Sequence, residues 1–469
     1  MPIHHTVFMD IVERFREAVK IKTGWPPGAL PGDADAEAPL LRFHDFLAEQ
    51  YPCFHKTAER WVLGPYSLIY RWPGGKTGSP AADSQSRDGR GSAPEGPALI
   101  LAHYDVVPAE AEKWTADPFG AEIRDGFIYG RGTLDMKSIL IGIMEGAETL
   151  CAGGFRPKRD IWFAFGGDEE RTGILGAQKT AQWFAQRGLR FSWILDEGSP
   201  IAENQIPGVD TPLALFGIEE KGFLSLDLTV VQKPGHASQP PSVQAAAVLA
   251  RALYRISKKP FPFRLVPTVE QFFTQLSGFA SGPQAFFMRH ARALGPLFFK
   301  ALSSNAVIAS MLHTTAAMTQ LAGSSADNVM PSEVRAVINL RLLQPWTIPE
   351  ATAFIKKAVN DDRVKITIHG MGTGPVPANP EHTKRSGPGW KEMEAALNAV
   401  YPGIPALVFI MVATTDSRHY QDLAGGIFRF SPHRLSPREL SRIHGHDERI
   451  SLENLRRGAE FYQRLFRLL

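Results

Sequence analysis

Two short segments place acidic residues and a histidine where apolar runs end. His103 and Asp105 lie two apart in LILAHYDVVP, and Asp168, Glu169 and Glu170 follow the apolar run IWFAFGG. In an extended chain, residues two apart point to the same face, so Asp105 can hold the His103 imidazole in the tautomer that a metal requires. Three adjacent carboxylates repel one another unless a cation neutralises them. These segments predict a metal site built on strand ends.

Four further residues stand in comparable places. Asp135 lies in YGRGTLDMK, Asp196 and Glu197 lie in WILDEG, and His444 lies far downstream in RIHGHDERI. Ligands of an open α/β sheet collect at the carboxyl ends of its strands. A donor set of His, Asp and Glu without Cys suits Zn²⁺, Mn²⁺ or Co²⁺ in a catalytic site. The Gly-rich YGRG lacks the Gly-Lys-Ser/Thr ending of a phosphate loop, so we interpret it as a turn.

The elements that must position these residues alternate along the first half of the chain. Strands are expected at Ser67–Arg71, Ala98–Ala102, Asp160–Phe165 and Ser192–Leu195, and helices at Ser138–Leu150 and Ile174–Arg187. This alternation predicts an α/β sheet with buried strands and helices on its faces. An amphipathic helix is expected around Val7, Ile11, Phe15 and Val19, and a Gly/Ser/Pro-rich surface loop at residues 74–96.

A different pattern begins near Gly222. Half-exposed strands are expected in FLSLDLTVV, VRAVINLRLL and VKITIHG, with helices at Ser242–Ile256 and Pro349–Val359. This order is typical of a small open-faced α+β domain. The first pattern then resumes with a helix at Trp390–Val400, a strand at Ala406–Val412 and a helix at Leu452–Leu468. We therefore predict a discontinuous catalytic domain, 1–221 and 371–469, with an inserted domain at 222–370. The aromatic stretch Phe261–Met318 is read as core or interface, or as the lining of an apolar channel.

Composition favours a globular enzyme over a nucleic-acid-binding or membrane-spanning protein. At 469 residues two domains are expected, with three as the alternative, and 44% hydrophobic and 21% charged residues are ordinary for a globular enzyme. A net charge of +3 argues against a nucleic-acid partner. Because the sequence contains no run of 18 apolar residues, we expect no membrane span. The N-terminus lacks the pattern of a signal peptide. Cys53 and Cys151 could form one disulfide, but free thiols in a reducing cytosol are expected. We therefore expect a cytoplasmic enzyme.

Taken together, the motifs resemble the co-catalytic di-zinc exopeptidases of the aminoacylase-1, carboxypeptidase S and succinyl-diaminopimelate desuccinylase group. The resemblance covers almost the whole chain, in HYDVVP, DGFIYGRGTLDMK, GGDEERTGILGA, LDEG, TDSRHY, RFSP and RIHGHDERIS. FREAVKIKT and IHGHDERIS are most similar to the carboxypeptidase S and N-acyl-amino-acid hydrolase branch. The resemblance implies a zinc-exopeptidase-like catalytic domain with a ferredoxin-like lid that also serves dimerisation.

The resemblance also implies a role for each metal-site residue. His103 would bind one metal, with Asp105 orienting its ring, and Asp135 would bridge two metals. Glu170 and His444 would complete the second metal. The first metal would take a carboxylate from Asp196 or Glu197; Asp196 is slightly preferred and Glu197 stays open. The cofactor is expected to be two Zn²⁺ per subunit, with Co²⁺ or Mn²⁺ as alternatives.

The expected reaction is hydrolysis of an amide bond next to a free carboxylate, in an N-acyl amino acid or a short peptide. A hydroxide shared by the two metals would attack the carbonyl, with Glu169 as general base and Asp168 bracing the turn. His236 would stabilise the oxyanion, often from the partner subunit of a homodimer formed through the lid, while Asn328 and Arg341 would bind substrate. The alternatives are a strict dipeptidase or desuccinylase of the same family, and a non-catalytic relative that only binds a ligand.

Overall fold

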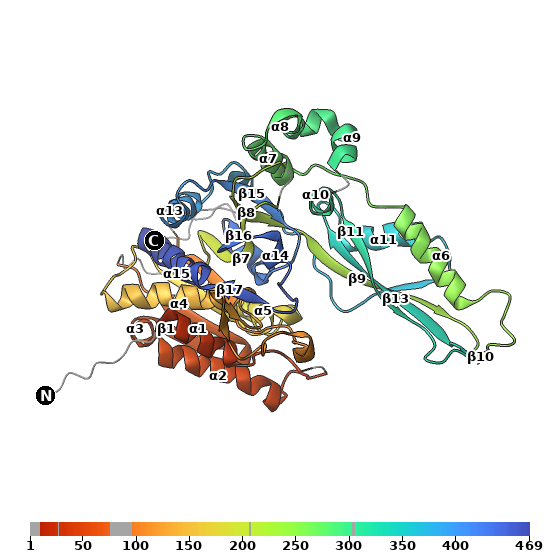
Figure 1. Cartoon of the computed structure of the whole chain (residues 1–469), viewed down its shortest axis with the longest axis horizontal. Helices are drawn as coiled ribbons and strands as arrows, with labels where there is room; N and C mark the ends of the chain where they lie inside the picture. The colour runs from red at the N-terminus through yellow and green to blue at the C-terminus, as the bar shows by residue number, and fades with distance from the viewer. Residues whose placement is uncertain (1–9, 27, 76–95, 206–207, 303–304) are drawn as a thin grey trace.

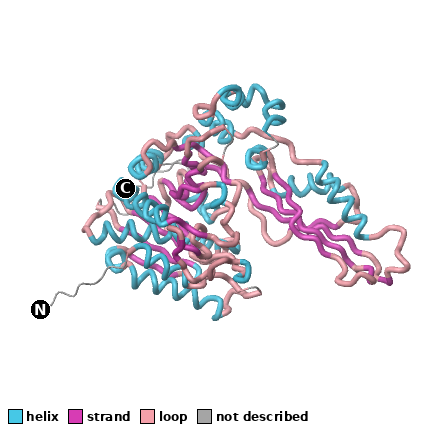
Figure 2. The backbone as a smooth tube through the Cα atoms, viewed as in Figure 1, coloured by secondary structure: helices cyan, strands magenta, loops and turns pink. Residues whose placement is uncertain are grey.

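The computed structural model describes residues 10–26, 28–75, 96–205, 208–302 and 305–469. A large body carries an elongated inserted domain to one side (Figure 1), and Figure 2 shows that each part has its own sheet. The predicted helix near the N-terminus begins at Ile11 as α1 (Ile11–Lys20), which buries Phe15 and Val19, whereas Val7 lies outside the described residues. Most of the predicted surface loop at 74–96 also lies outside them.

The body is built on an eight-stranded mixed sheet. Its order is β1-β2-β6-β3-β7-β16-β8-β15, and β3 runs parallel to both β6 and β7. The bounds are β1 (Glu59–Val62), β2 (Ser67–Trp72), β3 (Ala98–His103), β6 (Ile161–Gly166), β7 (Trp193–Ala202), β8 (Leu213–Glu220), β15 (Ala406–Met411) and β16 (Ile427–Leu435). Because β3, β6 and β7 are parallel, their carboxyl ends lie at one edge of the sheet, where the predicted metal-site segments follow.

Helices cover both faces of this sheet. Along β3, Ile100 belongs to the core on one face while Leu99 and Leu101 belong to the core on the other, as alternation in a strand requires. The first face packs against α1, α2 (Ala34–Gln50), α3 (Pro52–Thr57), α4 (Lys137–Ala152), α13 (Trp390–Val400) and α15 (Leu452–Leu468). The second packs against α5 (Ala177–Gln186) and the 3-10 segment η4 (Asp416–Leu423). Both faces are therefore buried, as the apolar strands predict.

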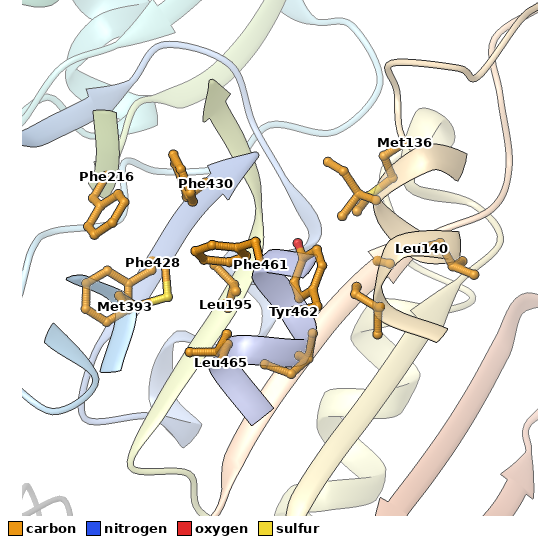
Figure 3. Packing of buried hydrophobic residues seen from close by; sticks show 14 of the residues in the cluster. Met136, Leu140, Leu195, Phe216, Met393, Phe428, Phe430, Phe461, Tyr462 and Leu465 are labelled. Atoms are coloured by element: carbon orange, nitrogen blue, oxygen red, sulfur yellow. The ribbon is translucent and has the colours of Figure 1, made fainter. Parts of the chain in front are cut away.

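The last helix, α15, packs against the first face of the eight-stranded sheet. The Ser451 side chain caps α15 by accepting a hydrogen bond from the Asn454 amide at 3.1 Å. Phe461, Tyr462 and Leu465 of α15 are fully buried between β16 and α4 (Figure 3). Each such side chain contributes about 1.5–3 kcal/mol by burial. The end of the chain therefore holds the loops before α4 and after β16 in place.

The inserted domain has a second sheet of order β11-β13-β9-β14, all antiparallel. Its elements are β9 (Gly222–Val231), α6 (Ala245–Lys258), β11 (Thr315–Ala322), β13 (Glu333–Leu342), α11 (Ile348–Val359) and β14 (Lys365–Ile368). The apolar side chains of β9 alternate toward α6 and α11 in a core of their own. Two helices on one face of a four-stranded sheet in this order form the ferredoxin-like arrangement that the resemblance implied. A two-stranded ribbon, β10 (Gly235–His236) and β12 (Val329–Met330), lies at the far end (Figure 1).

Four helices inside the predicted lid range pack elsewhere. They are α7 (Pro267–Leu276), α8 (Gly282–Arg289), α9 (Ala291–Leu302) and α10 (Ala306–Leu312). Phe272 and Met311 belong to the core of the body, and the Phe272 ring lies 5.4 Å from Phe409 of β15. The continuous range 222–370 therefore contains helices that join the core of the body, and α7 packs directly against the edge strand β15.

The remaining elements are short. A three-stranded sheet combines β4 (Ile123–Arg124), β5 (Phe127–Tyr129) and β17 (Arg449–Ser451), and α12 (Pro380–Thr383) and α14 (Pro437–Leu440) are single turns. The described part of the chain has no helix that is both long and apolar enough to cross a bilayer. Cys53 and Cys151 are free thiols.

Candidate metal centre

Five side chains from distant parts of the chain meet at the carboxyl edge of the large sheet. The Nε2 atom of His103 lies 3.0 Å from Asp135 Oδ1 and 3.2 Å from Glu197 Oε1. The Nε2 atom of His444 lies 3.0 Å from Asp135 Oδ2 and 3.1 Å from Glu170 Oε1. The two oxygens of Asp135 thus face two different histidines. The side chains thus form two sets of possible metal ligands, one around His103 and one around His444, and both sets include Asp135.

Asp105 supports this cluster from behind. Its carboxylate is fully buried, and Oδ1 lies 3.4 Å from His103 Nδ1. It also accepts hydrogen bonds from the amides of Glu169 and Glu170, each at 3.1 Å. The His103 ring is oriented by Asp105, whose backbone carbonyl lies 3.0 Å from Nδ1, while the Asp105 carboxylate positions η3 (Glu169–Arg171), the turn after β6.

A second buried carboxylate, Glu448, holds the loop that carries Asp135. It accepts hydrogen bonds from Arg131 Nη1 at 2.6 Å and from the amides of Gly132, Leu134 and Asp135 at 3.0, 2.7 and 3.2 Å. The Glu448 side chain is 1% exposed and that of Arg131 is 3% exposed. The segment before β17 therefore fixes the loop before α4, although the two are more than 300 residues apart in sequence.

Asp196 and Glu197 point to different partners. Asp196 Oδ2 accepts a hydrogen bond from the Ser417 amide at 2.8 Å, and Oδ1 accepts one from the Glu197 amide at 2.9 Å. Its two oxygens are thus directed at backbone amides, while the Glu197 carboxylate faces His103. The pairing of β7 with β16 jumps from Asp196–Arg429 to Ser199–Phe430, so a bulge lies at this point. Because a bulge re-aims side chains, the geometry favours Glu197 over the preferred Asp196 as the member of the metal cluster.

Glu169 lies beside the cluster, and its carboxylate forms no hydrogen bond with the cluster's described side chains. Within the described residues its carboxylate accepts no hydrogen bond, and its nearest cation is Arg418, whose Nη1 lies 3.8 Å from Oε1. Burial raises the pKa of Glu169 well above its usual value; the charges of Glu197 and Glu170 raise it further, while His103 and Arg418 act in the opposite direction. A carboxyl group of this kind is suited to take up and return a proton.

Asp168 has a structural position. It accepts hydrogen bonds from the amides of Leu175 and Gly176 at 2.7 and 2.8 Å, as expected for a residue that braces the turn. Burial raises its pKa to about 6, with a contribution from Asp105. The three adjacent acids of the motif therefore have three different surroundings.

The cluster favours positive charge. Burial lowers the pKa of His103, but the carboxylates of Glu197, Asp105 and Asp135 outweigh burial and raise it well above its usual value. Hydrogen bonds to Asp135 and Glu170 raise the pKa of His444 to about 10. Protons on the imidazoles thus offset carboxylates that otherwise repel one another.

Two arginines lie near Glu169. Arg341, at the end of β13, carries its guanidinium 5.0 Å from the Phe223 ring centre and interacts with the charges of Glu220 and Glu169. Burial lowers its pKa, and among the described residues its guanidinium donates no hydrogen bond. Arg418 donates to the carbonyls of Thr415 and Thr172 at 2.9 and 2.8 Å. The predicted substrate residue Arg341 therefore lies within range of the Glu169 charge, and Arg418, which sequence reasoning missed, lies directly beside Glu169.

His236 and Asn328 lie elsewhere. His236 belongs to β10 and Asn328 immediately precedes β12, at the end of the inserted domain away from the body (Figure 1). His236 is exposed, and the Asn328 carbonyl accepts a hydrogen bond from Ala237 at 3.0 Å. The structure thus brings these two residues together but places them away from the cluster of the same chain.

A model described as peptidase family M20/M25/M40 matches residues 99–468. The chain belongs to this family. N-fatty-acyl-amino acid synthase/hydrolase PM20D1 of Xenopus tropicalis is 32% identical over 459 residues, 97% of this chain and 85% of the relative. Probable carboxypeptidase S-like 2 of Dictyostelium discoideum is 32% identical over 466 residues, 98% of this chain and 85% of the relative. The predicted resemblance and branch are confirmed.

Solved structures agree on the fold. An M20 family metallo-carboxypeptidase from Sulfolobus solfataricus matches with a TM-score of 0.69 at 16% identity, covering 98% of this chain and 99% of that one. Human carnosine dipeptidase 1 matches with a TM-score of 0.68 at 14% identity, covering 98% and 95%. The predicted α/β fold class is confirmed.

Two residues at this site, Glu448 and Arg418, were not identified from the sequence. Glu448 lies inside RIHGHDERIS, where only His444 was given a role, and its neighbours gave no sign that it faces inward. Arg418 lies in TDSRHY, one of the motifs that carry the resemblance. The neighbouring His419 contacts the Thr172 carbonyl at 2.9 Å. The usable signal for Arg418 was a cationic residue within a motif of the resemblance.

Proposed function

We propose that this M20 family member is a two-metal amidohydrolase that cleaves the amide bond of N-acyl amino acids, next to the free carboxylate. The observation that carries the proposal is a half-buried Glu169 that accepts no hydrogen bond from the described residues and lies beside His103 and Glu197, with Arg418 at 3.8 Å. The names of several relatives, N-fatty-acyl-amino acid synthase/hydrolase, favour this substrate class over a peptide.

The donor set fits two divalent cations. His103, Glu197 and Asp135 would hold one, and His444, Glu170 and Asp135 the other. Imidazole and carboxylate without thiolate suit Zn²⁺, with Co²⁺ or Mn²⁺ as alternatives. The raised pKa values of both histidines support this assignment, since the pocket stabilises positive charge where the cations would replace protons. Bound there, the metals would polarise the scissile carbonyl and acidify water.

The chain's own side chains would do the rest. Glu169 would accept the proton of the attacking water at a carboxylate oxygen and pass it to the leaving amine nitrogen. Arg341 and Arg418 would bind the substrate carboxylate, for which the planar guanidinium is suited. Asp105 would keep the His103 ring in the tautomer that presents Nε2 to the metal.

We also propose that a second copy of the chain completes the site. His236 and Asn328 would act from the partner's lid, since their own lid carries them away from the body. The outer strand β11 supports pairing through the lid, because all its residues after Thr315 are exposed and an open edge strand is a ready pairing surface. His236 would then stabilise the oxyanion of the transition state.

A substrate panel tests the first proposal. Metal-loaded protein is incubated with N-acyl amino acids, N-succinyl-diaminopimelate and dipeptides, and free amino acid is measured. We expect release from N-acyl amino acids and its loss on chelation. Glu169→Gln should retain both metals and lose about 10²- to 10⁴-fold in kcat. Turnover confined to dipeptides or to the succinyl substrate would assign those activities instead, and metal binding without any turnover would favour a ligand-binding relative.

Mixed dimers test the second proposal. His236→Ala and Glu169→Gln should each be inactive, but co-refolded mixtures should regain activity because one hybrid site contains neither substitution. A mixture that stays inactive, or a protein that sediments as a monomer while active, would refute a role for the partner's His236.

The proposed compartment is the cytoplasm, which suits the free thiols of Cys53 and Cys151. Fractionation of the source cells with an antibody against the chain would test it, and enrichment in a secretory fraction would contradict it.

A further inference from the structure

A fully buried ion pair lies at the boundary between the body and the inserted domain. Glu220 is the last residue of β8, and β9 of the inserted domain begins after a single further residue, Lys221 (Figure 1). Arg429 of β16 donates from Nε to Glu220 Oε2 at 2.6 Å, and the two side chains are 0% and 1% exposed. Because burying two charges costs free energy that their attraction need not offset, such a pair is weak evidence of a purely stabilising role.

The Glu220 carboxylate also holds the loop after β15. It accepts hydrogen bonds from the Thr415 amide at 3.3 Å and from the Thr415 hydroxyl at 3.1 Å. The Thr415 carbonyl in turn accepts a hydrogen bond from Arg418 Nη1 at 2.9 Å, and the same nitrogen lies 3.8 Å from Glu169 Oε1. A continuous path of hydrogen bonds therefore runs from Glu220 through Thr415 to the guanidinium beside Glu169.

Arg341 interacts with the same carboxylate from the side of the inserted domain. Burial lowers the pKa of Arg341; the charge of Glu220 opposes this shift, and the charge of Arg418 adds to it. The two guanidinium groups therefore repel each other, while Glu220 attracts both of them. One buried carboxylate thus favours the approach of an arginine of the body to an arginine of the inserted domain.

We propose that Glu220 is a positioning residue for recognition of the substrate carboxylate. Through Thr415 it holds Arg418 in place, and its charge offsets the repulsion between Arg418 and Arg341. The inference rests on the proposed function, in which these two arginines bind the substrate carboxylate, and Glu220 itself touches neither substrate nor metal. Guanidinium groups that are held in place before binding lose less conformational freedom when a carboxylate arrives.

Arg429 favours the ionised form of this carboxylate. Burial raises the pKa of Glu220, and the charges of Arg429 and Arg418 act in the opposite direction. Nη1 and Nη2 of Arg429 have no hydrogen-bond partner among the described residues, so a change at Glu220 leaves a buried guanidinium without its hydrogen-bonded counter-charge. Glu220→Gln therefore endangers folding, whereas Thr415→Val interrupts the path to Arg418 and leaves the ion pair intact.

The test measures kcat and KM of the metal-loaded protein for N-acetyl-leucine. Thr415→Val should raise KM about tenfold and Glu220→Gln about 10- to 100-fold, as expected when a hydrogen bond to a charged group is weakened or lost. The loss should lie in KM rather than in kcat, because the carboxylate contact binds substrate and transition state alike. Thr415→Ser, which keeps the hydroxyl, should hold KM within about twofold of the unchanged protein.

Glu145→Gln is the matched control, because Glu145 is also a buried carboxylate paired with an arginine. It accepts hydrogen bonds from Arg14 Nη2 at 2.6 Å and from the Tyr51 hydroxyl at 3.1 Å. It joins α4 to α1, and neither helix carries a residue of the metal cluster. Its substitution should lower the stability of the fold but leave KM within about twofold of the unchanged value.

A double-mutant cycle shows whether the path acts through Arg418. Arg418→Ala should raise KM about 100-fold, since it removes a charged partner of the carboxylate. Adding Thr415→Val to Arg418→Ala should then change KM by no more than about twofold, because the displaced side chain is already absent. Effects of the two substitutions that multiply, or a fall in kcat with KM unchanged, would overturn the inference while the proposed function stands.

Binding of N-acetyl-leucine to metal-loaded Glu169→Gln protein, followed by calorimetry, gives a readout that does not depend on turnover. Adding Thr415→Val should weaken binding about tenfold, and adding Thr415→Ser should not. Loss of metal from the Thr415→Val protein would assign the network to the metal centre, through the Ser417 amide and Asp196, and would also overturn the inference. Failure of the unchanged protein to cleave any N-acyl amino acid refutes the proposed function, and the calorimetric result then decides the role of Glu220 alone.

Discussion

Replacing Glu448 with glutamine tests whether the metal centre depends on a carboxylate that touches no metal. Glu448 accepts hydrogen bonds from Arg131 and from three backbone amides, including that of Asp135. Glutamine keeps the shape but offers one acceptor oxygen, places an NH₂ group against N–H donors and leaves Arg131 buried without a counter-charge. Breaking a buried pair of this kind costs about 3–5 kcal/mol. Because the Asp135 loop loses its support, metal affinity should fall about 10- to 100-fold.

The assay has two parts. Urea unfolding of the metal-free protein gives the change in the free energy of unfolding, and competition with a chromogenic chelator gives the metal affinity. Glu453→Gln is the control, since that side chain is 70% exposed in an ion pair with Arg457 and should cost no more than about 1 kcal/mol. If Glu448→Gln bound metal as tightly as the unchanged protein, Glu448 would not position Asp135 and the reasoning would be refuted.

Two further predictions concern the body of the molecule. Burial lowers the pKa of His433 to about 4, whereas an unfolded histidine titrates near 6.5, so its contribution is complete above that value and is lost as pH falls toward 4. Between pH 7 and pH 5 the free energy of unfolding of His433→Phe should therefore fall about 2 kcal/mol less than that of the unchanged protein, and equal slopes in urea titrations would contradict this assignment. Phe461→Ala removes a fully buried ring that lies 5.6 Å from Phe430 and should cost about 3–5 kcal/mol in the same titration. A loss below about 1 kcal/mol would mean that α15 does not hold the first face of the sheet.

The resemblance implied that His103, Asp135, Glu170 and His444 share one site, and the structure brings their side chains together. Strand periodicity predicts β9 and β13, whose apolar residues alternate toward their helices. This alternation is local, so pattern and spacing suffice to find the two strands.

The missed features depend on contacts between distant segments. The orientation of Glu197 depends on a bulge between β7 and β16, strands that are more than 200 residues apart. The packing of α7 against β15 is equally long-range, and the aromatic residues of α7 would suit either domain. Composition can identify an apolar helix, but it does not reveal which surface that helix covers.

The order of the metal-site residues along the chain has a consequence for biosynthesis. The inserted sheet is complete at Ile368, with a core made within residues 224–364. The large sheet still lacks β15 and β16 at that point, and His444 follows later still. Domains generally fold as units while the ribosome is still at work. The lid can therefore form first and bring β8 and β9 into place, whereas the ion-binding pocket closes only after nearly all of the chain has been made. The metal pocket that includes His444 can be filled only after that residue has been synthesised and the fold around it has formed. The supply of metal would therefore limit maturation of the enzyme without slowing synthesis of the chain.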